Sequence, residues 1–221
     1  MDSNRKTAII VGVLFIIATV TSLISGTLVS SVIEDTDDLA NVSANENEMI
    51  IAAILLIALA ISVVLIPAFL FPILKKQDEG MALGYFGLRI IEALTPIVDA
   101  ICILLLITLS QEYVSAGSPA SSHYLTSGAL LISTREWAFL LNPIVFSLGA
   151  LVLYYLLYHS KLIPRWLSVW GLLAALLVLI AGLGGMFGNF LIVLAFPILV
   201  QEMVMAVWFI VKGFNLQNIK G

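Results

Sequence analysis

The sequence is poor in the residues that most enzymes use for catalysis and metal binding. It contains one cysteine and two histidines, and only 11% of its 221 residues are charged. Cys102 has no second cysteine with which to form a disulfide, and its position in an apolar run favours a small buried side chain over a thiol or metal site. His123 and His159 both lie near expected loops, which excludes haem ligation by paired intramembrane histidines.

Motifs that identify common enzyme classes are also missing. The sequence has no HExxH zinc motif, no GxSxG nucleophile elbow, no P-loop and no GxGxxG dinucleotide motif. It has no basic stripe that would bind nucleic acid, and no lysine in the middle of an apolar run that could form a retinal Schiff base. We therefore expect no cofactor, no metal site and no nucleic-acid partner, and we assign no catalytic residue.

Apolar residues, by contrast, dominate the chain. Hydrophobic residues make up 61% of it, and the mean hydropathy is +1.12. Such values predict an all-α polytopic membrane protein in a lipid bilayer, and residues 1–221 leave no room for a soluble domain beside a single integral membrane domain. Six runs reach the roughly 20 residues that a transmembrane helix needs. These six expected spans cover about residues 7–30, 49–74, 82–109, 136–158, 166–186 and 189–212. The first run is too long for a signal peptide and lacks a convincing cleavage site, so we expect a retained helix.

Basic residues occur in alternate connections between these spans, which predicts the orientation of the chain. The basic connections contain Arg5, Lys6, Lys75, Lys76, Lys161, Arg165, Lys212 and Lys220. Connections 31–48, 110–124 and 182–188 contain no Lys or Arg. Because basic residues collect in cytoplasmic loops, we expect the protein in the cytoplasmic membrane with both termini cytoplasmic and the acidic loop 31–48 outside. Residues 110–135 remain open between an outward extension of the fourth helix and a segment along the interface.

The third expected span carries three charged residues, Arg89, Glu92 and Asp99, where lipid penalises each one. At about 100° per residue, these residues fall with Tyr85 and Pro96 within an arc of about 80°. A charge at the bilayer centre costs about 2.5–3.5 kcal/mol on insertion scales, so the stripe is expected to face protein or water.

Counting depth along the helices brings a second acid to the level of this stripe. At about 1.5 Å per residue, Glu92 and Glu202 both lie about 15 Å from the inner surface, with Arg89 within reach of both. By the same count Asn142 is expected level with Asp99. The candidate residues for binding a ligand or ion are therefore Arg89, Glu92, Asp99, Asn142 and Glu202.

The charges of these residues do not balance. Glu92, Asp99 and Glu202 stand against one arginine, Arg89, which can pair with Glu92 at i,i+3 spacing. Arg135 and Glu136 are expected near the outer interface, where they would offset each other. The remaining acids would then be protonated, or would bind a cation, or would hydrogen-bond to neighbouring helices.

Three interpretations follow from this imbalance. The first is a protein that handles an ion, such as a proton or cation, or a small solute through a buried polar site. The alternative is a non-catalytic membrane component that assembles with partner helices. A third, a membrane enzyme that modifies a lipid with Glu92 and Glu202 as acid and base, is less favoured, so an enzyme is not the expected reading. A homo-oligomer is compatible with the sequence, but nothing in it supports one.

Three strings in the sequence together resemble a known family. They are GLRIIEALTPIVDA, SKLIPRWLSVWGLLAA and PILVQEMVMAVWFIVKGFN. They are similar to the bacterial and archaeal domain-of-unknown-function family 4386, whose members look like small six-span membrane proteins with no assigned activity. The resemblance covers nearly all of the chain except the acidic loop and 110–124, and implies a prokaryotic membrane protein. The residues that match its pattern are Arg89, Glu92, Pro164, Arg165, Trp166, Gly171, Glu202, Trp208 and Lys212.

Overall fold

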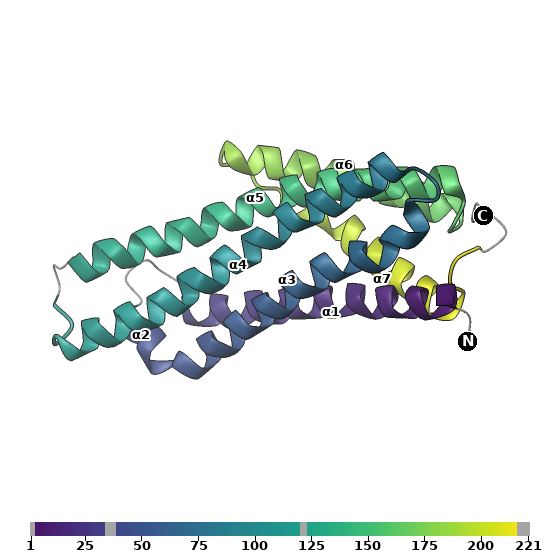
Figure 1. Ribbon diagram of the computed structural model, residues 1–221. Helices are drawn as coiled ribbons and strands as arrows, with labels where there is room; N and C mark the ends of the chain where they lie inside the picture. The colour runs from purple at the N-terminus through teal and green to yellow at the C-terminus, as the bar shows by residue number, and fades with distance from the viewer. Residues whose placement is uncertain (1–2, 34–38, 120–122, 216–221) are drawn as a thin grey trace.

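The computed structural model describes residues 3–33, 39–119 and 123–215, and within these ranges it is a bundle of helices without a strand (Figure 1). Six helices are long and apolar enough to cross a membrane, which confirms the predicted all-α, six-span architecture. The helices are α1 (Ser3–Val32), a short α2 (Leu39–Ala44), α3 (Glu46–Leu74), α4 (Glu79–Ser115), α5 (His123–Ser160), α6 (Arg165–Met186) and α7 (Phe196–Val211). A 3₁₀ turn, η1 (Ile192–Ala195), precedes α7 and continues into it.

Helices α4 and α5 are longer than the expected spans. They contain 37 and 38 residues, which corresponds to about 55 Å each, while a bilayer core is about 30 Å thick. Residues 123–135 continue the fourth expected span as part of α5, so for this segment the helical extension holds and not the interfacial one. The last span begins later than expected, because residues 189–191 are not helical and η1 starts at Ile192.

The six long helices form a closed ring. Helix α3 packs between α1 and α4, α5 packs between α4 and α6, and α7 contacts both α6 and α1. The start of α1 and the end of α7 lie at the same end of the bundle, here called the terminal end (Figure 1). The α4–α5 hairpin and α2 project at the opposite end (Figure 1).

Helices α1 and α7 close this ring through two specific contacts. Gly12 of α1 lies so close to α7 that an added Cβ would be 2.6 Å from the backbone oxygen of Ala206. Arg5 donates hydrogen bonds to the carbonyl oxygens of Phe209 at 3.1 Å and Ile210 at 2.6 Å. These carbonyls belong to the last turn of α7, which has no intrahelical donors for them. The side chain of Arg5 therefore caps the last helix from the first.

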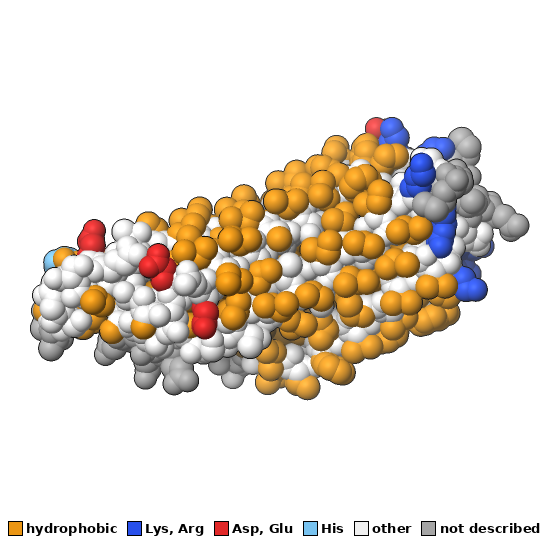
Figure 2. Space-filling model, turned by 90° about the horizontal axis from the view of Figure 1, so that it is seen from below, with side chains coloured by type: hydrophobic (Ala, Val, Ile, Leu, Met, Phe, Trp, Pro, Cys, Tyr) orange, Lys and Arg blue, Asp and Glu red, His pale blue; other side chains and the backbone are white. Residues whose placement is uncertain are grey.

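The surface of the bundle divides into bands. An apolar belt covers the middle of the face seen in Figure 2, Lys and Arg side chains gather at the terminal end, and acidic side chains appear near the opposite end. Of the acidic loop, Glu34, Asp35, Asp37 and Asp38 lie outside the described residues. Glu46 begins α3 and accepts a hydrogen bond from Gln111 of α4 at 2.9 Å.

Candidate functional site

Arg89 and Glu92 form an ion pair within α4, in the interior of the ring. Arg89 Nη1 donates to Glu92 Oε1 at 2.9 Å and to Oε2 at 2.7 Å, and each residue is only 4% exposed. This pairing confirms the local i,i+3 interaction that the sequence predicted. The register of α4 is set at the terminal end, where Asp78 accepts a hydrogen bond from the backbone nitrogen of Met81 and caps the helix.

Asp99 pairs with Arg135, which corrects the expectation that Asp99 lacks a counter-charge and that Arg135 is offset by Glu136. Arg135 Nε donates to Asp99 Oδ1 at 2.5 Å, and the two side chains are 16% and 19% exposed. The pair forms because α5 continues as a helix beyond the expected span and runs beside α4. Asp99 is therefore a link between two helices and does not line the cavity described below.

Asn142 lies about one helical turn nearer the terminal end than expected, at the level of Thr95 and not of Asp99. Its Nδ2 donates to Thr95 Oγ1 at 2.6 Å, and Thr95 Oγ1 donates in turn to the backbone oxygen of Glu92 at 2.8 Å. The expected level with Asp99 was wrong, because Arg135 occupies that level. Asn142 instead joins α5 to the turn of α4 that carries the buried ion pair. Sequence reasoning missed Thr95, because its contact with Asn142 joins two different helices.

Glu202 projects from α7 into the same cavity as Arg89 and Glu92. The preceding residue, Gln201, is fully buried, accepts a hydrogen bond from Tyr154 Oη at 2.5 Å, and donates to the backbone oxygen of Leu167 at 3.1 Å. Gln201 thus holds α7 against α5 and α6 and fixes the rotation of α7. Glu202 itself makes no hydrogen bond or ion pair with any residue in the part of the chain that the structure describes.

The cavity has a volume of about 410 Å³ and is bordered by all six long helices and the 187–195 connection. Its polar lining consists of Thr19, Ser22, Arg89, Glu92, Asn142 and Glu202, and most other lining side chains are apolar. Four lining residues are more than half exposed on the bundle surface: Leu23, Phe139, Ile192 and Phe196. All four are apolar, so the cavity reaches the bundle surface among apolar side chains.

Two buried donors beside the cavity are left without an acceptor. Tyr85 Oη and Arg89 Nε have no hydrogen-bond partner among the described residues. The guanidinium carbon of Arg89 lies 5.8 Å from the ring centres of both Tyr85 and Phe146, so two aromatic faces flank the cation. In the described ranges no three His, Cys, Asp or Glu side chains come together. The charged groups of the cavity are therefore one ion pair, Arg89 with Glu92, and one further carboxylate, Glu202.

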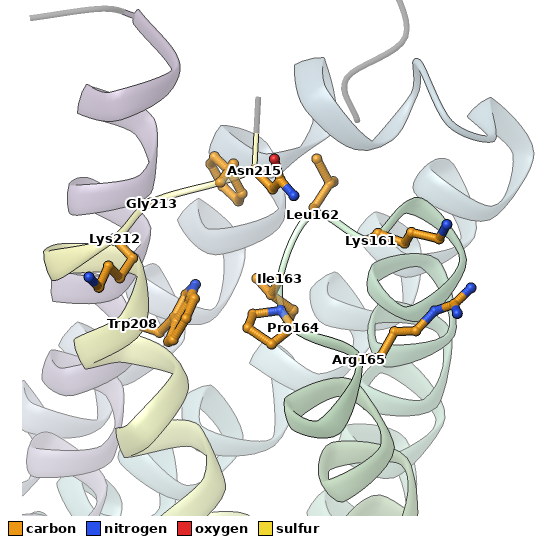
Figure 3. A pocket seen from close by; sticks show the side chains of 10 residues that line it. Lys161, Leu162, Ile163, Pro164, Arg165, Trp208, Lys212, Gly213 and Asn215 are labelled. Carbon is orange, nitrogen blue, oxygen red and sulfur yellow. The ribbon is translucent and has the colours of Figure 1, made fainter. Parts of the chain in front are cut away.

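A second cavity, of about 530 Å³, lies at the terminal end between the α5–α6 turn and the end of α7 (Figure 3). Lys161, Arg165 and Lys212 lie on its rim, but Figure 3 shows Lys212 directed away from the other two. The guanidinium of Arg165 instead lies 5.1 Å from the ring centre of Tyr158. Because the cations do not converge, this cavity is a weaker candidate than the one at Glu202.

Comparison with known proteins gives one match. A family model described as "Domain of unknown function (DUF4386)" matches residues 10–213, which is nearly the whole chain. No curated protein and no solved structure matches the sequence.

Proposed function

Because this chain belongs to the family described as domain of unknown function 4386, a description that names no activity, we propose its function from the geometry of the cavity. The protein binds an ion or small solute at mid-membrane depth, and Glu202 is the group that takes up a proton or a cation. The observation that carries this proposal is the Glu202 carboxylate, which has no partner among the described residues and lies in a cavity that opens at the bundle surface.

The charges around the cavity support a role for Glu202 in particular. The carboxylate of Glu92 is already bound through both oxygens by Arg89, so this pair is locally neutral. Asp99 is neutralised by Arg135. A further carboxylate in a membrane interior is costly unless a proton, a cation or hydrogen-bond donors accompany it. Glu202 is the residue at which that requirement is unmet.

The same geometry favours ligand binding over the two alternative functions, a non-catalytic membrane component and a lipid-modifying enzyme. A purely structural polar stripe would be packed on every side, whereas Arg89, Glu92 and Glu202 border a cavity of about 410 Å³. An acid–base mechanism on a lipid would need Glu92 to be free to accept a proton, and Arg89 holds both of its oxygens. Pro96 and Pro143 lie inside helices that line the cavity, where helix interruptions suit a binding site.

We also propose that the protein lies in the cytoplasmic membrane of a bacterium or archaeon with both termini in the cytoplasm. Support comes from the Lys and Arg side chains that gather at the terminal end of the apolar belt (Figure 2).

The experiment that tests the site is modification of Glu202 by dicyclohexylcarbodiimide, a membrane-soluble reagent for carboxyl groups. The full chain is reconstituted in lipid nanodiscs, treated, and digested. The peptide from Phe196 to Lys212 contains Glu202 as its single side-chain carboxyl, so an adduct on this peptide reports on that residue alone. We expect labelling of the natural protein and none of Glu202→Gln.

A pair of variants on α1 separates access through the cavity from general exposure to lipid. Ala18 lines the cavity, whereas Val20 is 44% exposed on the same helix and does not line it. Ala18→Phe is expected to reduce labelling of Glu202, and Val20→Phe is expected to leave it unchanged. If Glu202 stays unlabelled in lipid while unfolding in detergent makes it reactive, the cavity is closed to ligands and the proposal fails.

A further inference from the structure

Five phenylalanine rings line the cavity that contains Glu202. Phe15 comes from α1, Phe139 and Phe146 from α5, Phe190 from the α6–η1 connection, and Phe196 from α7. Phe139 and Phe190 are in edge-to-face contact, with ring centres 5.6 Å apart and planes at 71°. Much of the apolar lining of the cavity is therefore aromatic.

An aromatic lining together with one carboxylate that has no ion-pair partner favours a positively charged ligand. The face of an aromatic ring carries partial negative charge and attracts cations, most strongly where water is excluded. Since Arg89 and Glu92 neutralise each other, Glu202 supplies the remaining charge of the cavity, and that charge is negative when the residue is ionised. Arg89 already shows this chemistry, because its guanidinium lies 5.8 Å from the ring centre of Phe146.

The position of the opening adds a second property of the ligand. Leu23, Phe139, Ile192 and Phe196 line the cavity, are apolar, and are each more than half exposed on the surface of a bundle whose helices are apolar enough to span a membrane. A molecule that enters here comes from the hydrocarbon of the bilayer and must be soluble in it. The cavity volume of about 410 Å³ is within the range of about 300–1,000 Å³ that small-molecule sites occupy.

We propose that the cavity binds a lipophilic organic cation, with the cationic centre beside the carboxylate of Glu202 and the apolar groups among the phenylalanine rings. This inference rests on the proposed function and names the ligand class of the same site. An anionic amphiphile is disfavoured, because Arg89 is engaged by Glu92 and the free charge of the cavity is negative.

The test uses tetraphenylphosphonium and its anionic counterpart of the same shape, tetraphenylborate. Equilibrium dialysis measures their binding to the full chain in nanodiscs, after subtraction of partitioning into empty nanodiscs. We expect saturable binding of tetraphenylphosphonium at one molecule per chain and no saturable binding of tetraphenylborate. Saturable binding of tetraphenylborate with equal or greater affinity would overturn the inference, because the cavity would not select positive charge.

Variants assign this binding to the carboxylate and to the rings. Glu202→Gln is expected to lower the affinity by at least about tenfold, whereas Glu202→Asp, which keeps the charge, retains most of it. Phe190→Leu, which removes the ring but keeps an apolar side chain, is expected to lower it by about threefold or more. The matched control is Glu136→Gln, because Glu136 is exposed on α5 and lies outside the cavity lining. This variant should bind tetraphenylphosphonium with the same affinity as the natural protein. Equal affinities of the natural protein and Glu202→Gln would overturn the inference.

Protection from carbodiimide separates failure of this inference from failure of the proposed function. Bound tetraphenylphosphonium should suppress labelling of Glu202 in the natural protein. If Glu202 is labelled but tetraphenylphosphonium neither binds nor protects, the organic-cation inference is wrong while the cavity remains a binding site. If Glu202 is not labelled in lipid at all, the proposed function itself is wrong, and this inference falls with it.

Discussion

Arg135 of α5 donates a hydrogen bond from Nε to Asp99 Oδ1 of α4 at 2.5 Å, which joins the two helices on the side of Glu92 that is farther from the terminal end. The contact changes the charge balance of the whole bundle. With Asp99 paired to Arg135 and Glu92 paired to Arg89, Glu202 is the carboxylate of the predicted set that has no ion-pair partner of its own among the described residues. Of the three acids, Glu202 is therefore the candidate for binding a ligand.

Breaking the Asp99–Arg135 pair from either side should destabilise the protein. A hydrogen bond to a charged group contributes about 1.5–3 kcal/mol, so we expect Asp99→Asn and Arg135→Gln each to lower the free energy of unfolding by about 2 kcal/mol. The double variant should lose clearly less than the sum, because neither charge is then left alone. Reversible unfolding in mixed detergent micelles measures these values. Glu136→Gln should stay within about 0.5 kcal/mol of the natural protein. Losses that add to within about 0.5 kcal/mol would show that the two residues are not coupled.

The buried pair on α4 should be more sensitive to removal of one partner. Arg89 and Glu92 are each 4% exposed, and a buried charge without its partner costs about 3–5 kcal/mol. We expect Arg89→Gln to destabilise the protein by that amount, as measured by the same unfolding method. Replacing both residues by Gln should recover much of the stability. If the double variant is as unstable as Arg89→Gln alone, the loss comes from packing around the arginine and not from the stranded carboxylate.

The contact of α1 with α7 should not tolerate a methyl group at Gly12. An added Cβ would lie 2.6 Å from the backbone oxygen of Ala206. Because a backbone atom cannot rotate away as a side chain can, the two helices would have to move apart. We expect Gly12→Ala to lower the free energy of unfolding by about 1–3 kcal/mol. Gly26 is the matched control on α1, because an added Cβ there meets nothing within 4 Å. Gly26→Ala should be neutral or stabilising by up to about 1 kcal/mol through helix propensity. Equal effects of the two variants would contradict the close approach.

The orientation of the chain can be read from cysteine accessibility in intact cells. In a Cys102→Ser background, Ser3→Cys places a thiol at the start of α1, and Ser115→Cys places one at the end of α4. Both positions are exposed. A membrane-impermeant maleimide should label Ser115→Cys in intact cells and Ser3→Cys only after lysis. The reverse pattern would place the termini outside.

Contacts within one helix could be predicted from the sequence, whereas contacts between helices could not. The Arg89–Glu92 pair was predictable because both residues lie in one helix at i,i+3 spacing, where helical geometry alone brings them together. The lack of a counter-charge for Asp99 and the level of Asn142 were mispredicted, because each depends on a contact with another helix. The expected level of Asn142 differed from the observed one by about one turn, which is about 5 Å. Such an offset between neighbouring helices depends on side-chain packing between them. The phenylalanine residues of the cavity could not be identified from the sequence, because a Phe that packs in the core and a Phe that lines a ligand site occur in the same apolar runs.

The sequence by itself determined that this protein enters a membrane, that it has six spans, and that one face of α4 is polar. These properties depend on the length and composition of apolar runs and on helical periodicity, which are local to each segment. Only the tertiary structure decided which acids are neutralised and which one borders an open cavity. The long extension of α5 brings Arg135 to Asp99, and the anchoring of Gln201 by Tyr154 and Leu167 turns Glu202 toward the interior of the ring. Contacts between helices set these relationships, because the axial shift and rotation of a helix have no counterpart in its own sequence.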